Sequence, residues 1–236
     1  MADPFKQAKF FKKSDVAGVK GNRIINLEPD PDIPDRAVAY RHAKDLASEL
    51  GDIRGRWRCI LGGRFVFGDL IEALIVNNNW LVRELWINTL SINNENIDSL
   101  SNLIDPEADY VRELNLIVSD HFYSNERGSL VQYAYEVLDI DGKFQLAACR
   151  THMKTTLIWV DDGTPDGRKI VIEGSANLRS SGNIESITVE ECPEWFDVNR
   201  ELLAGILERY KTIRKPLSEA ETWRQTDRTA LRAAAT

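Results

Sequence analysis

The sequence predicts an α/β fold. Short apolar segments of strand type alternate with segments of helical periodicity in the first half of the chain, and several strands follow one another in the second half. The strands expected at residues 84–90 and 114–118 flank a helix, which is the pattern of a βαβ unit with two parallel strands. With 236 residues, 43% of them hydrophobic, the chain is long enough to bury a core without metals or disulfides.

Each element is predicted from its own periodicity and from the residues that bound it. Runs rich in β-branched and aromatic residues predict strands at residues 57–61, 84–90, 114–118, 144–148, 151–160, 169–173 and 184–190. Apolar residues at helical spacing predict helices at residues 37–50, 67–76 and 124–138, with a further helix that ends near residue 103. Gly51 is expected to end the first helix, and either Ser91 or Asn93 to cap the one that ends near residue 103.

We divide the chain into an extended N-terminal arm (residues 1–35), an α/β domain (36–192) and a helical C-terminal extension (193–236). Closely spaced prolines make the end of the arm hostile to helix. Pro193 is expected to open the first helix of the extension, and Pro216 to stop it before a weakly apolar last helix. The apolar stripe expected on the first helix consists of Trp195, Val198, Leu202, Ile206 and Tyr210.

Charge and cysteine content narrow the class of protein. The formal net charge is −7, and the acidic excess lies in the body of the chain, whereas both ends are basic. An acidic body does not attract nucleic acid by bulk electrostatics, so the basic ends would bind it, contact an acidic neighbour, or remain solvated.

Three scattered cysteines are too few for a disulfide framework or a zinc site. No segment has the composition of a signal peptide or a membrane span, so we expect a reduced, cytoplasmic protein without stable membrane association.

One pair of polar residues stands out in the strand expected at 151–160. Side chains alternate along a strand, so His152 and Lys154 are expected to share one face, with Met153, Leu157 and Trp159 on the other. An imidazole and an ammonium would then lie together.

A second pair follows the next strand. If the chain is extended after residue 173, Ser175 and Asn177 share a face, and the acidic segment at residues 161–167 is a turn by composition. The two segments make a hairpin that brings both pairs of side chains to one surface, and Gly174 permits a close approach of backbone or substrate. Imidazole is a nucleophile or proton carrier near neutral pH, and ammonium and amide groups are donors to anionic oxygens. No metal-ligand spacing or cofactor motif accompanies them, so a phosphoryl group is the expected target.

These residues resemble the signature of the phospholipase D superfamily. His-Met-Lys at 152–154 followed by Gly-Ser-Ala-Asn at 174–177 is similar to the family's HxK…GSxN motif, and the resemblance covers roughly residues 55–192. The resemblance implies a mixed β-sheet flanked by helices. The segment at residues 180–185 is similar to the one that carries an acidic residue after GSxN in the family, which here is Glu185.

The resemblance also implies a mechanism at a phosphodiester that needs no metal or cofactor. One neutral histidine attacks phosphorus to give a phosphohistidine, and a second, protonated histidine donates to the leaving oxygen and then activates water. His152 is expected to be the nucleophile or the acid. Lys154, Ser175 and Asn177 are expected to contact and support the phosphate, and Glu185 to orient an imidazole.

The chain departs from the family pattern at one position. The family usually has an aspartate five residues after the lysine, where this sequence has Trp159, and the acidic residues come later, at Asp161 and Asp162. Either Asp161 takes over that role through a β-bulge, or the role is lost.

The implied chemistry needs two His-x-Lys sets, and this chain has one. The remaining histidines, His42 and His121, have no lysine two residues on. We expect His42 at the surface, and we expect His121, past a strand end, to be a loop residue with a local partner unless it reaches the pocket. A second copy of the chain would therefore supply the second motif, in a homodimer or higher oligomer with a shared site.

Other residues admit two interpretations each. Four cations near the motif would form a rim that follows a phosphate backbone or would be ordinary solvated charge; they are Arg150, Arg168, Lys169 and Arg179. Trp195 and Phe196 are expected to be core or dimer contacts. Trp223 would anchor a partner chain or simply pack.

The preferred functional hypothesis is a nuclease of the phospholipase D type that hydrolyses nucleic-acid phosphodiesters. The alternative is a catalytically weak or silent fold that serves as an assembly or nucleic-acid-binding subunit, with its terminal arms contacting neighbouring subunits. Phospholipid hydrolysis ranks third, because no membrane-facing amphipathic stretch stands out.

Overall fold

A computed structural model describes residues 35–40, 42–62, 65–179 and 183–210. Residues 1–34 of the arm predicted at 1–35 lie outside the described residues, as does the last helix predicted after Pro216, with Trp223. Asp35, the last residue of the predicted arm, begins a strand. Within the described residues, eight strands form one mixed sheet in the order β1-β2-β8-β7-β6-β3-β4-β5. The strands are β1 (Asp35–Tyr40), β2 (Arg56–Leu61), β3 (Leu81–Asn88), β4 (Leu114–Ser119), β5 (Phe144–Cys149), β6 (Thr155–Asp161), β7 (Arg168–Gly174) and β8 (Glu185–Glu191).

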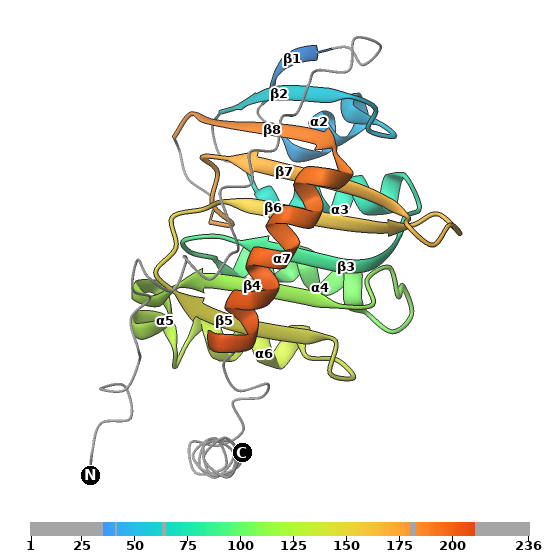
Figure 1. Ribbon diagram of the computed structural model, residues 1–236. Helices are drawn as coiled ribbons and strands as arrows, with labels where there is room; N and C mark the ends of the chain where they lie inside the picture. The colour runs from blue at the N-terminus through green and yellow to red at the C-terminus, as the bar shows by residue number, and fades with distance from the viewer. Residues whose placement is uncertain (1–34, 41, 63–64, 180–182, 211–236) are drawn as a thin grey trace, which may run out of the picture.

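Helices cover both faces of this sheet, in three layers (Figure 1). One face is covered by α2 (Ala43–Leu50), α3 (Phe67–Asn77), α4 (Asn94–Ile104) and α6 (Leu130–Leu138), and the short α5 (Asp120–Glu126) lies at one end of β4. The other face is crossed by the single long helix α7 (Pro193–Tyr210). None of the described helices is long and apolar enough to cross a membrane.

The direction of each strand decides which residues meet at each edge of the sheet. β3 runs parallel to β4 and β4 to β5, while β6 is antiparallel to both β3 and β7, and β8 is antiparallel to β7 and β2. The carboxyl ends of β2, β3, β4, β5 and β7 therefore meet the amino ends of β6 and β8. We call this the carboxyl edge and the opposite one the amino edge.

Two apolar clusters hold the layers together. The larger one lies between the sheet and helices α2, α3, α4 and α6, and includes Leu70, Leu100 and the edge-to-face pair of Tyr135 and Phe144, whose centroids are 5.1 Å apart. The smaller one lies under α7, where Phe196 and Leu203 pack on Leu157 and its neighbours. Burial of such side chains is the main favourable term in folding.

Much of the predicted element order is confirmed. The parallel β3–β4 pair has the register Leu85↔Leu114 to Asn88↔Ile117, and the β6–β7 hairpin turns through the acidic segment at residues 162–167. Asn93, rather than Ser91, caps α4, since its side chain accepts from the Asn96 backbone N–H.

The helix predicted at residues 37–50 is wrong in its first part. Residues 37–40 belong to β1, which pairs in parallel with β2, and the helix begins only at Ala43. Pairing with a neighbouring strand overrides local helix propensity there. Gly51 ends the helix as expected, with φ 55°.

The helix predicted at residues 124–138 is two helices. α5 begins earlier, at Asp120, because the Ser119 hydroxyl accepts from the Phe122 N–H. The chain then breaks at residues 127–129 before α6 starts. Gly128 lies at this break, and glycine is a weak helix former.

The buried face of α7 differs from the predicted stripe. The buried residues are Phe196, Asn199, Leu203 and Ile206, whereas Trp195 is half-buried. The indole of Trp195 donates to Glu173 (3.0 Å), so its polar end is used at the border of the layer. Phe196 is core, in agreement with one of the two expected roles.

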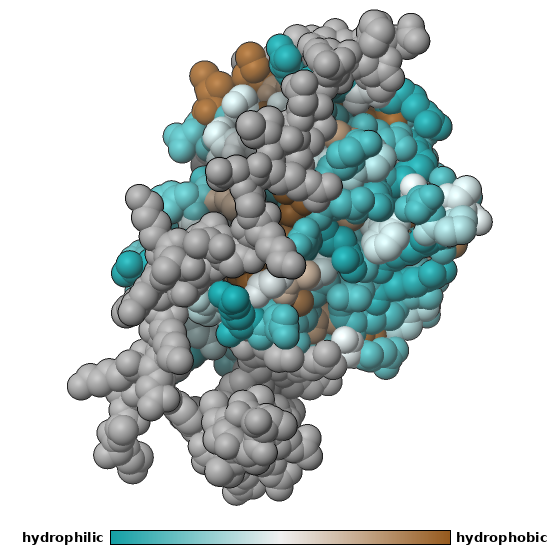
Figure 2. Space-filling model, viewed as in Figure 1, coloured by the Kyte–Doolittle hydropathy of each residue, from teal (hydrophilic) through white to brown (hydrophobic). Residues whose placement is uncertain are grey.

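Hydrophobic surface is unevenly spread over the α7 face. Figure 2 shows this face as mostly hydrophilic, with brown surface at the upper left, toward the β2 end of the sheet. α7 crosses the sheet from β7 to β5, so it does not cover the end formed by β1, β2 and β8. Among the described residues, the most exposed large hydrophobic side chains are Ile184 (80%) and Ile60 (54%), at β8 and β2.

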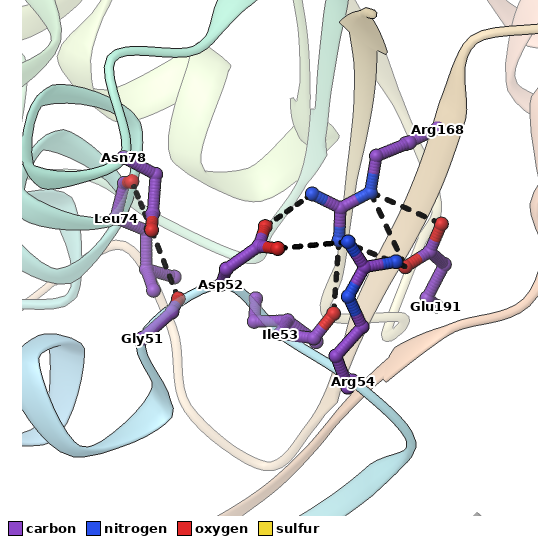
Figure 3. A network of polar contacts seen from close by, with 8 residues as sticks. All are labelled: Gly51, Asp52, Ile53, Arg54, Leu74, Asn78, Arg168 and Glu191. Atoms are coloured by element: carbon purple, nitrogen blue, oxygen red, sulfur yellow. Dashed lines mark hydrogen bonds and ion pairs between the residues drawn. The ribbon is translucent and has the colours of Figure 1, made fainter.

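Ion pairs join strands and loops at the amino edge (Figure 3). Arg168 of β7 bonds Glu191 of β8 (2.8 Å), the Ile53 carbonyl (2.9 Å) and Asp52. Arg54 bonds Asp52 as well, at 2.9 Å. Burial alone would raise the pKa of Asp52, but Arg168 and Arg54 outweigh it and hold that pKa below its usual value.

Candidate functional site

The carboxyl edge collects the residues predicted to form the site. His152 and Lys154 lie in the loop just before β6, and Ser175 and Asn177 follow the end of β7. Glu185 is the first residue of β8. Because β6, β7 and β8 are adjacent, with neighbouring strands about 4.8 Å apart, the fold brings all three segments to one end of the sheet.

The His-x-Lys segment is a loop, so the predicted strand over 151–160 starts four residues late. The alternation that was expected to align His152 and Lys154 therefore does not apply. Instead the Lys154 ammonium folds back and donates to the His152 carbonyl (3.0 Å). The imidazole is exposed, and no hydrogen bond joins its ring to any described residue.

The loop is shaped by Thr151. Its hydroxyl donates to Asn88 Oδ1 at the end of β3 (3.0 Å) and accepts from the Met153 N–H (3.1 Å). A hydroxyl that bonds the backbone two residues on closes a tight turn and competes with strand pairing. This is the physical reason that β6 begins only at Thr155.

Ser175 and Glu185 form a direct pair. The Ser175 hydroxyl donates to Glu185 Oε2 and accepts from the Ser186 N–H (3.0 Å), and the Ser175 N–H donates to the Ser186 carbonyl (2.8 Å). Three hydrogen bonds thus hold Ser175 against the first two residues of β8, which fixes the Glu185 carboxylate beside it.

Gly174 is required for this arrangement. A Cβ atom there would overlap the carbonyl of Ser186 and lie 2.8 Å from the Ile187 Cα, both of which are backbone atoms that cannot move aside. The close approach expected at Gly174 is therefore that of β8, and it puts Ser175 next to Glu185.

Asn177 presents a donor. Its Oδ1 accepts from the Leu90 N–H (3.2 Å), so the orientation of the amide is set by a backbone donor. The NH₂ group has no hydrogen-bond partner among the described residues and can donate to an anionic oxygen. The adjacent Leu178 N–H donates to Thr89 Oγ1 (2.9 Å), which ties the same segment to the end of β3.

Two small hollows open beside these residues. One is lined by Asn88, Thr89, Lys154, Gly174 and Ala176 with their neighbours. The other is lined by Ala176, Asn177, Arg179, Asn183 and Glu185 with apolar side chains of β2 and α3. Phe67 and Ala176 line both hollows, so the two adjoin each other.

Comparison with known proteins adds likenesses of fold. No protein-family model matches the chain, and no curated protein matches it. Among solved structures, the phospholipase D family member Nuc from Salmonella typhimurium matches 54% of this chain and 80% of its own, at 14% identity and a TM-score of 0.40. NucT from Helicobacter pylori matches the same shares at 17% identity and a TM-score of 0.39. TrmBL2, an archaeal chromatin protein, matches 70% of this chain and 58% of its own, at 13% identity and a TM-score of 0.40.

The predicted α/β fold is confirmed by the arrangement of the strands and helices. The mixed sheet flanked by helices that the resemblance implies is present in the described residues. Similarity at these levels assigns no chemistry to this chain, so chemistry has to be inferred from the residues themselves.

Asp161 lies at the other end of β6 from the His-x-Lys loop. It is the last residue of β6, at the amino edge, where its carboxylate bonds Arg83 (2.8 Å) and Arg112 (3.1 Å). Seven residues separate it from Lys154, which is about 23 Å along a strand. The irregularity in the β3–β6 pairing is at Val82/Glu84 and does not bring Asp161 back toward the phospholipase D-like motif.

Trp159, at the position of the family's aspartate, has a structural role. Its ring packs edge-to-face on Phe196 (centroids 6.3 Å apart), and its Nε1–H donates to the Asp166 carbonyl (2.8 Å). Cations lie over the ring at 5.4–5.5 Å, from Arg83, Lys169 and Arg200. The side chain therefore joins the sheet to α7.

The four cations proposed as a rim separate into two pairs. Arg168 and Lys169 are at the amino edge, where Arg168 bonds Asp52 and Glu191 and Lys169 bonds Asp197 (2.7 Å). Neither is near the motif, so the rim interpretation is wrong for both. Arg150 and Arg179 are exposed at the carboxyl edge, and Arg150 pairs with Asp120 (3.4 Å).

The other two histidines have surface positions. His42 is exposed and is the N-cap residue of α2, without a side-chain cap bond. His121 is exposed in the first turn of α5, not in a loop, and it has a local partner, since the Asn125 amide donates to its carbonyl (2.8 Å).

Two cysteines are excluded as nucleophiles near neutral pH. Burial raises the pKa of Cys59 to about 11, and burial together with the charge of Asp120 raises that of Cys149 to about 11. A thiol at such a pKa is protonated and inert at pH 7. No group of three or more His, Cys, Asp or Glu side chains within the described ranges is placed to hold a metal ion.

Asn88, Thr89 and Thr151 are site residues that the sequence did not reveal. Each bonds a motif segment, yet none belongs to a motif. The available signal was a polar residue at the end of an apolar strand, which is common and therefore weak.

Proposed function

We propose that this chain is a phosphodiesterase of the phospholipase D type that hydrolyses nucleic-acid phosphodiester bonds. The observation that supports it most is the meeting of His152 and Lys154 with Ser175 and Asn177 at one edge of the sheet. Imidazole, ammonium and amide donors in one place suit an anionic phosphoryl group.

In the proposed reaction one neutral His152 imidazole attacks phosphorus. A nitrogen–phosphorus bond forms as the bond from phosphorus to the leaving oxygen breaks, and a second, protonated imidazole donates its proton to that oxygen. The second imidazole, now neutral, takes a proton from water, which attacks the phosphohistidine. The nitrogen–phosphorus bond breaks, and phosphate monoester and free histidine result.

The remaining residues stabilise charge and orient groups. The NH₂ group of Asn177 and the unused donors of the Lys154 ammonium would contact the non-bridging oxygens, where negative charge develops. Glu185, held by Ser175, would accept from an imidazole N–H and fix its tautomer. The exposed Arg179 and Arg150 would contact flanking phosphates.

The second imidazole would come from a second copy of the chain. The His152 ring has no partner among the described residues, and one chain holds one His-x-Lys set. A two-fold axis through the site would place both imidazoles on opposite sides of one phosphorus. Ile184, 80% exposed and next to Glu185, is apolar surface that such a copy would cover.

The test is cleavage of single- and double-stranded DNA and RNA in EDTA by the wild-type chain and His152→Ala. We expect cleavage by the wild type and a loss of at least about a thousandfold in the variant. Because His152 is exposed and bonds nothing through its ring, the melting temperature should not change. Trapping of a phosphohistidine on His152 would identify the nucleophile, and equal activity of both proteins would refute the proposal.

One observation favours the alternative of a silent assembly or binding subunit. The position of the family's aspartate holds Trp159, which is committed to packing against α7. In that case no substrate would be cleaved, His152→Ala would bind nucleic acid as the wild type does, and the chain would form ordered assemblies in sedimentation experiments.

A further inference from the structure

The end of β3 contacts both motifs. Thr151 in the His-x-Lys loop donates to the Asn88 side chain (3.0 Å). The Leu90 N–H donates to Asn177 (3.2 Å), on the other motif. Three consecutive residues of one strand end, from Asn88 to Leu90, therefore hold the two motif segments on a common support, with the Thr89 hydroxyl as the middle contact.

The bond between Asn88 and Thr151 is shielded from water. Asn88 is 1% exposed and Thr151 is 7% exposed. A hydrogen bond in such a place is electrostatically stronger than one in water, which favours a fixed geometry of the groups it joins. The Asn88 NH₂ group is buried without a partner among the described residues, which costs stability.

The imidazole has no anchor of its own. His152 is exposed, and its ring makes no hydrogen bond to the described residues. The residue before it is anchored through the Thr151 side chain, and the residue after it is anchored through the Met153 N–H, which donates to the same hydroxyl. The place of the ring is therefore set by the backbone on either side.

We infer that Asn88 and Thr151 are positioning residues for His152, an inference that rests on the proposed phosphodiesterase activity. The Thr151 hydroxyl closes the loop, and Asn88 fixes that hydroxyl relative to the segment carrying Asn177. Without it the imidazole would sample positions away from phosphorus, and a displacement of about 1 Å is enough to cost on the order of a hundredfold in rate. Binding of the phosphate by Lys154 and Asn177 would continue.

The test compares Thr151→Val, Thr151→Ser and Thr164→Val with the wild type. Valine keeps the shape and removes the hydroxyl, and serine restores it. Thr164 is the matched control, because its hydroxyl also donates to a side chain, Asp162 (2.6 Å), and accepts a backbone N–H, from Gly167 (3.1 Å), but at the amino edge.

We expect Thr151→Val to lower kcat about 10- to 100-fold with KM changed less than about twofold. Thr151→Ser should stay within about threefold of the wild type, and Thr164→Val should keep the wild-type kcat. A loss of folding in Thr151→Val would instead lower the melting temperature and the active fraction of that variant, with kcat per active molecule at the wild-type value. Wild-type kcat in Thr151→Val, or no rescue by serine, overturns the inference.

A second readout separates this inference from the proposed function. Hydrogen exchange of the Met153 amide should accelerate in Thr151→Val and not in Thr164→Val, whether or not the protein cleaves anything. One outcome is that the wild type cleaves nothing while exchange of the Met153 amide still accelerates in Thr151→Val. That result would refute the proposed function and, with it, the positioning role, and it would show only that the Thr151 hydroxyl shapes the loop. If Met153 exchange is unchanged in an active protein, the positioning role alone fails.

Discussion

The amino edge and the carboxyl edge are ends of the same strands, yet their polar groups are used differently. At the amino edge, charged side chains bond one another, as Arg168 does with Asp52 and Glu191 (Figure 3). At the carboxyl edge, side chains bond mostly backbone groups, and the NH₂ group of Asn177 has no hydrogen-bond partner in the part of the chain that the structure describes. The ion pairs of the amino edge stabilise the fold, whereas the donors at the carboxyl edge are the groups for which we propose a ligand. This division is typical of α/β proteins, whose sites lie at the carboxyl ends of strands.

The largest expected effect on stability comes from Arg168→Met. The Arg168 side chain is 12% exposed, and its guanidinium bonds Asp52, Glu191 and the Ile53 carbonyl. The guanidinium also lies 5.5 Å from the Trp80 ring centroid. Its removal leaves carboxylates without their cation, so we expect the free energy of unfolding to fall by about 2–4 kcal/mol in urea titrations. Arg54→Met is the control, since Arg54 bonds the same carboxylates but is 71% exposed, and it should cost less than about 1 kcal/mol. Equal losses would show that burial does not distinguish the two arginines.

At the carboxyl edge, Gly174→Ala adds only a methyl group, yet we expect it to lower both the stability of the fold and cleavage. The added Cβ would meet the backbone of Ser186 and Ile187, which would push β7 away from β8 and separate Ser175 from Glu185. We expect a loss of about 1–3 kcal/mol in unfolding free energy, together with loss of cleavage. Gly205→Ala in α7, where nothing lies within 4 Å of the new Cβ, should instead stabilise the protein by up to about 1 kcal/mol. A Gly174→Ala protein as stable and active as the wild type would contradict the close approach.

Acid should weaken the amino edge. The pKa of Asp52 is lowered because Arg168 and Arg54 outweigh its burial, and that of Asp161 is lowered chiefly by its bond to Arg83. A carboxyl group with a lowered folded-state pKa stabilises the fold above its unfolded pKa, about 3.9, and that stability is lost as pH falls through the folded pKa. Urea midpoints should therefore drop below about pH 4. The drop in the urea midpoint should be smaller in Arg168→Met, because the pKa of Asp52 then lies nearer its usual value. An equal drop in the variant and the wild type would mean that Arg168 does not lower the pKa of Asp52.

Of the substitutions considered, Asp161→Asn is expected to change stability and cleavage least. The variant weakens the contacts to Arg83 and Arg112 at the amino edge, so a small fall in melting temperature should appear in differential scanning fluorimetry. Cleavage should be unchanged, because Asp161 is at the opposite edge from His152. Loss of cleavage in a fully folded variant would return the motif role to Asp161.

The sequence allowed some of these positions to be predicted and not others. The β6–β7 hairpin follows from two apolar strands around an acidic, glycine-containing turn, and this pattern is local. The strand β1 was predicted as helix, because the run at residues 37–40 has no period of its own and is a strand only through its partner β2. The shift of the buried face of α7 to Phe196 and Leu203 likewise depends on where the helix lies on the sheet.

The residues of the candidate site were predicted from the sequence, whereas the residues that hold them in place were found only in the structure. His152, Lys154, Ser175 and Asn177 are recognisable by spacing, because a motif is a property of the chain. That Arg168 and Asp161 belong to the amino edge depends on strand direction, which no short segment encodes. The same holds for Asn88 and Thr151, which are 63 residues apart and bonded to each other. Local order is set by neighbouring residues, whereas the meeting of distant ones is decided only when the sheet assembles around its buried core.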